Sequence, residues 1–143
     1  SQTIYQRSLM DVIDDRDTKE NSKYGEYDLI DTLLNKDYLN FLKISNYLQS
    51  INAPLTYIIF LLNSELEKLY LIQQSKNNKP FIPQFLQTKY RTASSMYTSD
   101  SLLNALKNII KLDVNSKYNS KNSNSWLSFN DLFSIIMNNN TQV

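Results

Sequence analysis

Residues 43–72, KISNYLQSINAPLTYIIFLLNSELEKLYLI, decide the fold that the sequence predicts. The first part of this stretch predicts a helix that ends near Ile51. The next residue, Asn52, is of a type that tolerates the left-handed conformation in which many helices end. Pro54 has no backbone N–H and a φ angle suited to the first turn of a helix, so it predicts the start of another helix. The chain is therefore expected to turn a tight corner at residues 52–54.

The helix after this corner is predicted over residues 54–69 and is the most apolar of the chain. Apolar side chains cover more than half of its circumference, which is typical of a helix that other elements enclose in a core. The side chains concerned are Leu55, Ile58, Ile59, Leu61, Leu62, Leu66 and Leu69.

Two helices are predicted before the corner, over residues 26–35 and 38–51. Apolar residues recur in both at intervals of three or four positions, as they do on the buried face of a helix. Residues 35–37 predict the break between them, because Asp37 is of a type that caps helix starts. The sequence thus predicts three consecutive helices joined by short connections.

A short β-hairpin is predicted after the third helix, over residues 70–83. Two apolar runs, at residues 69–72 and 80–83, flank a polar link, as the two strands of a hairpin do. Pro80 and Pro83 lack the N–H that a strand residue donates, so the second strand is expected to be short or at a sheet edge.

The C-terminal part is predicted to add two helices, one that starts at residues 98–100 and ends near Asp113, and one capped by Ser128. Trp126 is expected to anchor the start of the last helix. The tract at residues 115–125 is rich in Asn, Ser and Lys and is predicted to be a surface loop. Residues 87–98 carry no pattern that assigns a structure. The helix that ends near Asp113 is predicted from the regular three-to-four spacing of Leu102, Leu103, Leu106, Ile109 and Ile110.

The N-terminal part of the sequence is acidic, whereas the rest is basic. Residues 1–40 hold nine acidic and five basic side chains, and residues 41–143 hold five acidic and ten basic ones. A short helix is predicted at residues 8–13, followed by a polar loop. The chain is accordingly divided into a peripheral acidic segment at 1–25, a core at 26–86, and a helical extension at 87–143 packed on the same domain.

The composition favours one helical domain and excludes several classes of enzyme. A chain of 143 residues fits a single domain, and one Gly and three Pro are few for a fold with many turns. There is no Cys and no His, which excludes disulfides, thiolate zinc sites and His-dependent nucleophilic catalysis. The longest apolar run, residues 57–62, is far too short for a membrane span. We therefore predict no enzymatic activity, no cofactor and no metal site.

The order of three helices and a hairpin over residues 26–86 resembles a winged-helix domain, a form of the helix-turn-helix fold. Asn52 stands at the turn position that is often glycine in such units. The fold class is thus predicted to be mainly α, a winged-helix-like three-helix core with a short β-hairpin wing and additional C-terminal helices. An all-α helical bundle is the alternative, and no particular family stands out. Positions that are apolar in helix-turn-helix units are occupied here by Leu48, Ile51, Ile58 and Leu61.

The residues of the third predicted helix favour a contact with protein over a contact with the bases of DNA. A recognition helix carries Lys, Arg, Asn or Gln near its start, but the first cation of this helix is Lys68, at its far end. We therefore expect a non-enzymatic protein-protein interaction module in a larger, nucleic-acid-associated assembly, located inside the cell in the nucleus or cytoplasm. A partner protein or a second copy of the chain is the expected ligand, and no small-molecule substrate is evident. The predicted contact residues are Leu55, Tyr57, Phe60, Tyr70, Phe81 and Ile82.

Direct DNA binding is the alternative function. Basic residues on the predicted wing and on the helices after it could hold a phosphate backbone without reading its sequence. An enzyme that relies on carboxylates alone is a third, weaker alternative. The predicted nucleic-acid contacts are Lys76, Lys79, Lys89, Arg91, Lys107 and Lys111.

Overall fold

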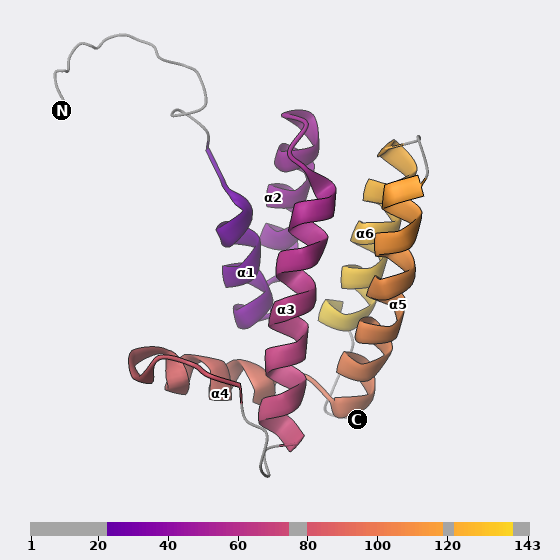
Figure 1. Ribbon diagram of the computed structural model, residues 1–143. Coiled ribbons are helices and arrows are strands. Elements are labelled where there is room, and N and C mark those ends of the chain that lie inside the picture. The colour runs from indigo at the N-terminus through magenta and orange to yellow at the C-terminus, as the bar shows by residue number, and fades with distance from the viewer. Residues whose placement is uncertain (1–22, 75–79, 119–121, 139–143) are drawn as a thin grey trace, which may run out of the picture.

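The computed structural model describes residues 23–74, 80–118 and 122–138, and within these ranges the fold is all-α (Figure 1). The described part contains no strand. Its elements are six α-helices and one 3₁₀-helix: α1 Glu26–Asn35, α2 Tyr38–Ser50, α3 Leu55–Gln74, η2 Gln84–Leu86, α4 Gln87–Ser95, α5 Ser99–Tyr118 and α6 Asn122–Asn138.

Local capping explains the first two helices, whose predicted positions are confirmed. The Asp28 carboxylate accepts a hydrogen bond from the Gly25 N–H at 2.7 Å and closes the first turn of α1. Lys36 ends α1 in the left-handed conformation, with φ 54°. Asp37 caps α2, where its carboxylate accepts from the Asn40 N–H at 3.3 Å.

The predicted corner between α2 and α3 is also confirmed. Asn52 has φ 58°, the left-handed conformation that Asn tolerates. The Ala53 N–H donates to the Leu48 carbonyl at 2.9 Å, and the Ile58 N–H donates to the Pro54 carbonyl at 3.1 Å. The first hydrogen bond closes the end of α2 and the second opens α3, so the chain turns within four residues.

The predicted β-hairpin wing is wrong. Residues 70–72, which were expected to belong to its first strand, continue α3, and this helix ends at Gln74. The reason is helical periodicity, because Leu62, Leu66 and Leu69 follow one another every three or four residues and are all fully buried. Residues 80–83 are non-helical and lead into η2. The helix-turn-helix resemblance itself stays a prediction.

The C-terminal half is more helical than predicted. Residues 87–95, which carry no clear pattern, form α4, and α5 extends past Asp113 to Tyr118. The predicted loop at 115–125 is wrong over residues 115–118 and 122–125, which are helical. Trp126 lies within α6 instead of before it. It is fully buried and its ring meets that of Phe129 at 5.7 Å, so tertiary packing overrides the weak helix propensity of Asn and Ser.

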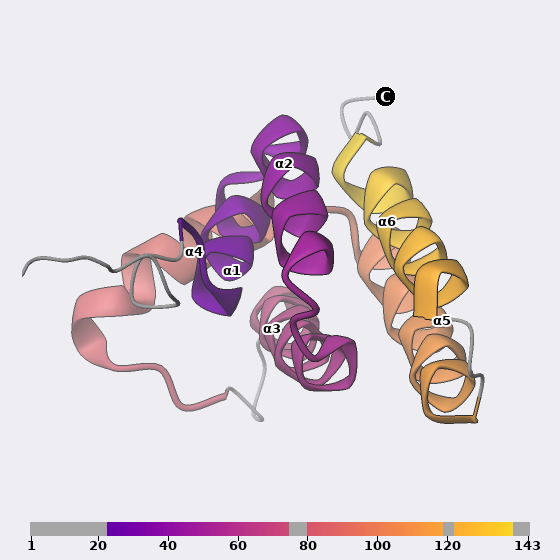
Figure 2. The same ribbon diagram turned by 90° about the horizontal axis from the view of Figure 1, so that it is seen from above.

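The helix α3 packs against α5 on one side and against α1 and α4 on the other (Figures 1 and 2). The helix α2 packs against α1 and α6, and α4 lies across the chain below α1 and beside the C-terminal half of α3. A cluster of stacked aromatic rings joins α2 to α6, with the Phe41 ring centroid 4.9 Å from that of Phe133 and 5.7 Å from that of Phe129. The core is thus continuous from α1 to α6.

Candidate protein-binding groove

A groove runs between the N-terminal half of α3 and the C-terminal half of α5. The two helices pack against each other and run antiparallel (Figure 1). The groove has a volume of about 510 Å³. Its lining consists of Pro54, Thr56, Tyr57, Ile59, Phe60 and Asn63 from α3 and the corner before it, and of Ile109, Ile110, Asp113, Val114 and Lys117 from α5.

Four exposed apolar side chains form the walls of the groove. Tyr57 and Phe60 stand one turn apart on α3 and are 42% and 65% exposed. Ile110 and Val114 stand one turn apart on α5 and are 61% and 50% exposed. Most apolar side chains of this size are buried in soluble domains. Four of them around one hollow form a contiguous exposed apolar patch, which is a common feature of interaction sites.

The polar residues of the groove carry no net charge. Asp113 and Lys117 form an ion pair at 3.1 Å on α5. Tyr57 adds a hydroxyl group, and a hydrogen bond to the Tyr27 hydroxyl raises the pKa of Tyr57 above its usual value. That group is therefore neutral at physiological pH. A groove with neutral polar rims and apolar walls suits an apolar ligand surface more than a charged one.

The structure brings two of the six predicted contact residues together. Tyr57 and Phe60 line the groove. Leu55 is 5% exposed and belongs to the core, so it is not available to a partner. The remaining three lie elsewhere: Tyr70 is half-buried, Ile82 lines a different cavity beside α4, and Phe81 is 87% exposed and does not line the groove.

Ile110 and Val114 are not among the predicted contact residues. The spacing of apolar residues predicted the helix from Ile109 and Ile110 together, yet adjacent residues of a helix point about 100° apart. Ile109 is buried against the core and Ile110 consequently faces outward. Ile110 follows Ile109 directly and Val114 stands four positions after Ile110. This spacing is the sign in the sequence of a second apolar face on α5.

The four predicted nucleic-acid contacts that the structure describes are not gathered on one surface. Lys76 and Lys79 lie outside the described residues. Lys89 forms an ion pair with Asp31 at 3.2 Å, and Arg91 lines the cavity between α4 and the end of α3. The other two, Lys107 and Lys111, are exposed on α5, which lies on the opposite side of α3 from α4 (Figures 1 and 2).

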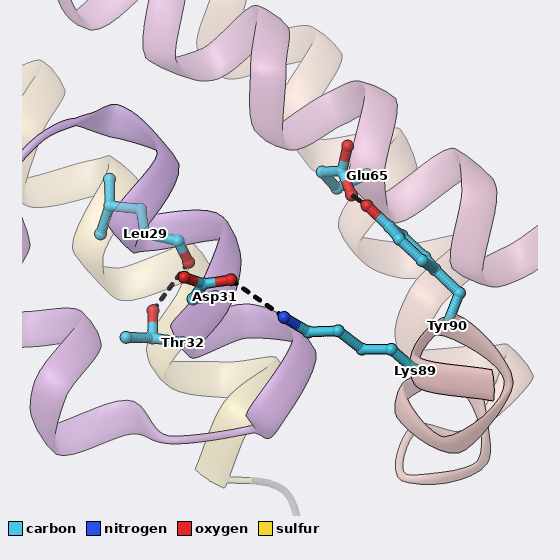
Figure 3. A network of polar contacts seen from close by, with 6 residues as sticks. All are labelled: Leu29, Asp31, Thr32, Glu65, Lys89 and Tyr90. Atoms are coloured by element: carbon cyan, nitrogen blue, oxygen red, sulfur yellow. Dashed lines mark hydrogen bonds and ion pairs between the residues drawn. The ribbon is translucent and has the colours of Figure 1, made fainter. Parts of the chain in front are cut away.

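A buried polar cluster attaches α4 to α3 (Figure 3). The Tyr90 hydroxyl donates to the Glu65 carboxylate at 2.5 Å, and Lys68 pairs with the same carboxylate at 3.0 Å. Burial, together with this hydrogen bond, raises the pKa of Tyr90 well above its usual value. Glu65 is 6% exposed, and neither it nor Tyr90 lines the groove. The cluster is therefore part of the helix packing and not of the candidate site.

The described part of the chain shows no group of three or more acidic side chains that could hold a metal ion. In the same part, no helix combines the length and the apolarity that crossing a membrane requires. Comparison with known proteins found no matching protein-family model, no similar curated protein and no similar solved structure. The function is therefore inferred from the groove itself.

Proposed function

We propose that this protein is a non-enzymatic interaction module that binds a segment of a partner protein in the groove between α3 and α5. The observation that carries the proposal is the position of Tyr57, Phe60, Ile110 and Val114 around one hollow. These side chains come from two helices that are distant in the sequence. Their exposure costs solvation free energy that an apolar ligand surface would recover.

The size of the patch supports one docked segment more than a dimer of this chain. Four partly exposed side chains of this kind present roughly 300–400 Å² of apolar surface. A standard protein interface buries about 800 Å² on each partner, and permanent homodimers bury more. A single helix or extended segment laid into a groove needs a smaller surface.

Direct DNA binding draws less support. Phosphate contacts supply most of the affinity for DNA, and the four described basic candidates lie on two sides of α3, with Lys89 already paired to Asp31. That the assembly contains nucleic acid, that the chain acts in the nucleus or cytoplasm, and that it has no enzymatic activity stay predictions.

Quantitative affinity purification from the cell of origin tests the proposal. Three tagged chains are compared: the natural sequence, a Phe60→Asp, Ile110→Asp double variant, and a Leu39→Asp control. Leu39 is 81% exposed on α2 and does not line the groove, so the control places one aspartate on another apolar surface residue. Proteins lost by the groove variant alone identify the partner. If every protein retained by the natural chain is also retained by the groove variant, the groove is not the binding site.

A further inference from the structure

A second cavity lies between the C-terminal half of α3 and α4, two helices that pack against each other (Figure 1). Its volume is about 420 Å³, and small-molecule sites in proteins measure about 300–1,000 Å³. Among the described residues it shares none with the lining of the α3–α5 groove, so its ligand is independent of the proposed function. The lining of this α3–α4 cavity consists of Ile72 and Gln73 from α3, Pro80 and Ile82 from the stretch before η2, and Gln87, Arg91, Ser94 and Ser95 from α4.

Hydrogen bonds within the protein hold the walls of the α3–α4 cavity in place. The Gln73 amide group donates to the Ser94 carbonyl at 2.8 Å, and the Ser94 hydroxyl donates to the Leu69 carbonyl at 3.1 Å. The Gln87 amide group donates to the Ile82 carbonyl at 3.3 Å. The cavity is therefore formed before a ligand arrives, which lowers the entropic cost of binding.

Arg91 brings the only charge among the lining residues that the structure describes. Its side chain is exposed, and its guanidinium donates to the Thr88 hydroxyl at 3.4 Å, a long contact for a hydrogen bond. A guanidinium has several further N–H donors, and no carboxylate of the described residues forms an ion pair with this one. The α3–α4 cavity consequently presents a positive charge for which its described lining holds no counter-charge.

The rest of the lining is largely apolar or already hydrogen-bonded. Ile72 and Ile82 are half-buried and pack against the core, and Pro80 adds a third apolar surface. The Ser95 hydroxyl donates to the Thr92 carbonyl at 2.6 Å, so this donor is used within α4. A ligand that fits both parts of the cavity has an apolar body and one anionic group. A carboxylate suits the guanidinium because the two can form a pair of parallel hydrogen bonds.

We propose that the α3–α4 cavity binds a small organic acid with an apolar body. The carboxylate of this ligand pairs with the Arg91 guanidinium, and its apolar body covers Ile72, Pro80 and Ile82. These residues come from two helices and the stretch before η2, so the packing of α4 on α3 is what brings them together.

An NMR titration of the full chain with octanoate tests the proposal, because octanoate has both parts of the ligand. Octanamide has the same length but no charge, and acetate has the charge but no apolar body. Octanamide should bind about tenfold more weakly than octanoate, because it lacks the hydrogen bonds between charged groups. Acetate should also bind more weakly, because it leaves the apolar wall uncovered. The amide signals expected to shift saturably with octanoate are those of Ile72, Ile82, Arg91 and Ser95.

Two variants that each remove one positive charge separate a binding role of Arg91 from a structural role. Arg91→Gln should weaken octanoate binding about tenfold and leave octanamide binding unchanged. Lys107→Gln removes the same charge from an exposed position of α5 outside the cavity and should change neither. Because both side chains are exposed, thermal unfolding should be nearly the same for the two variants and the natural chain.

Several results would overturn the proposal. It is wrong if octanoate causes no saturable change at the cavity, or if octanoate binds no more tightly than octanamide or acetate. It is also wrong if Arg91→Gln binds octanoate as the natural chain does, or if both variants lose octanoate binding equally. The affinity purification can succeed or fail independently of these results, since its variants change residues of the groove and not of the cavity.

Discussion

Phe60 of α3 and Ile110 of α5 line the same groove although they are far apart in the sequence, and both side chains are more exposed than buried. Neither residue contributes to the fully buried core, which α3 and α5 build from other faces. Because the fold does not need these two side chains, we propose that they serve binding.

Replacing Phe60 with Asp should therefore leave the stability of the fold nearly unchanged. Substitutions at exposed positions usually change the free energy of unfolding by no more than about 0.5 kcal/mol. Leu62, two residues further along α3, is fully buried, so Leu62→Asp places an unpaired charge in the core and should prevent folding. Urea unfolding followed by circular dichroism compares the two variants. A large loss of stability in Phe60→Asp would mean that this side chain belongs to the core.

Tyr90→Phe should destabilise the protein, because it removes the hydroxyl that donates to the buried Glu65 carboxylate. Leaving a buried acceptor without its donor costs roughly 1–3 kcal/mol. Tyr118→Phe removes the same atom from a side chain that is 85% exposed and should have no measurable effect. Equal unfolding free energies for the two variants would contradict the packing described for α4.

Alkaline pH should destabilise the fold through Tyr97. Burial raises the pKa of this residue above its usual value of 10.0, and its hydroxyl donates to the Leu33 carbonyl at 2.6 Å. A group whose pKa is raised on folding contributes stability that is complete below the unfolded pKa and is lost as the pH rises above it. The difference in unfolding free energy between the natural chain and Tyr97→Phe should thus be constant up to about pH 9 and shrink above pH 10. A difference that does not change with pH would mean that Tyr97 titrates normally.

The corner at Asn52 should tolerate glycine and reject a β-branched residue. The φ angle of 58° is left-handed, a conformation that costs most side chains about 1–2 kcal/mol. Asn52→Val should lower the unfolding free energy by an amount of that order, whereas Asn52→Gly should not. Asn46→Val makes the same chemical change at an exposed helical position of α2 and controls for side-chain propensity. If both valine variants behave alike, the corner is not strained as described.

Local signals explain which parts of this fold the sequence predicts. Asp37, Asn52 and Pro54 act on the backbone next to them, so the first two helices and the corner follow from the residues alone. The end of α3 does not, because a run of Leu, Tyr and Ile suits a strand as well as a buried helix. The helix is favoured over the strand because Leu66 and Leu69 are fully buried in it, and α3 packs on the later helices α4 and α5.

The candidate site, too, could be predicted from the sequence only in part. Tyr57 and Phe60 could be predicted from the excess of apolar residues on one helix. Their neighbours Ile110 and Val114 could not, because only the antiparallel packing of α5 on α3 places them beside this helix. The sequence gives no sign that Leu55 is buried while Tyr57 is exposed, because both stand in the first turn of α3. In the structure Leu55 faces the core.

Site-specific photo-crosslinking shows whether a partner protein occupies the groove. A photoreactive phenylalanine analogue at position 60 stands in the groove, and the same analogue at position 39 stands at an apolar site on α2 that is more exposed than position 60. After irradiation in the cell of origin, we expect a protein adduct at position 60 that is absent at position 39 and disappears when Ile110→Asp is added. Adducts of equal yield at both positions, or an adduct at position 60 that survives Ile110→Asp, would contradict the proposed function.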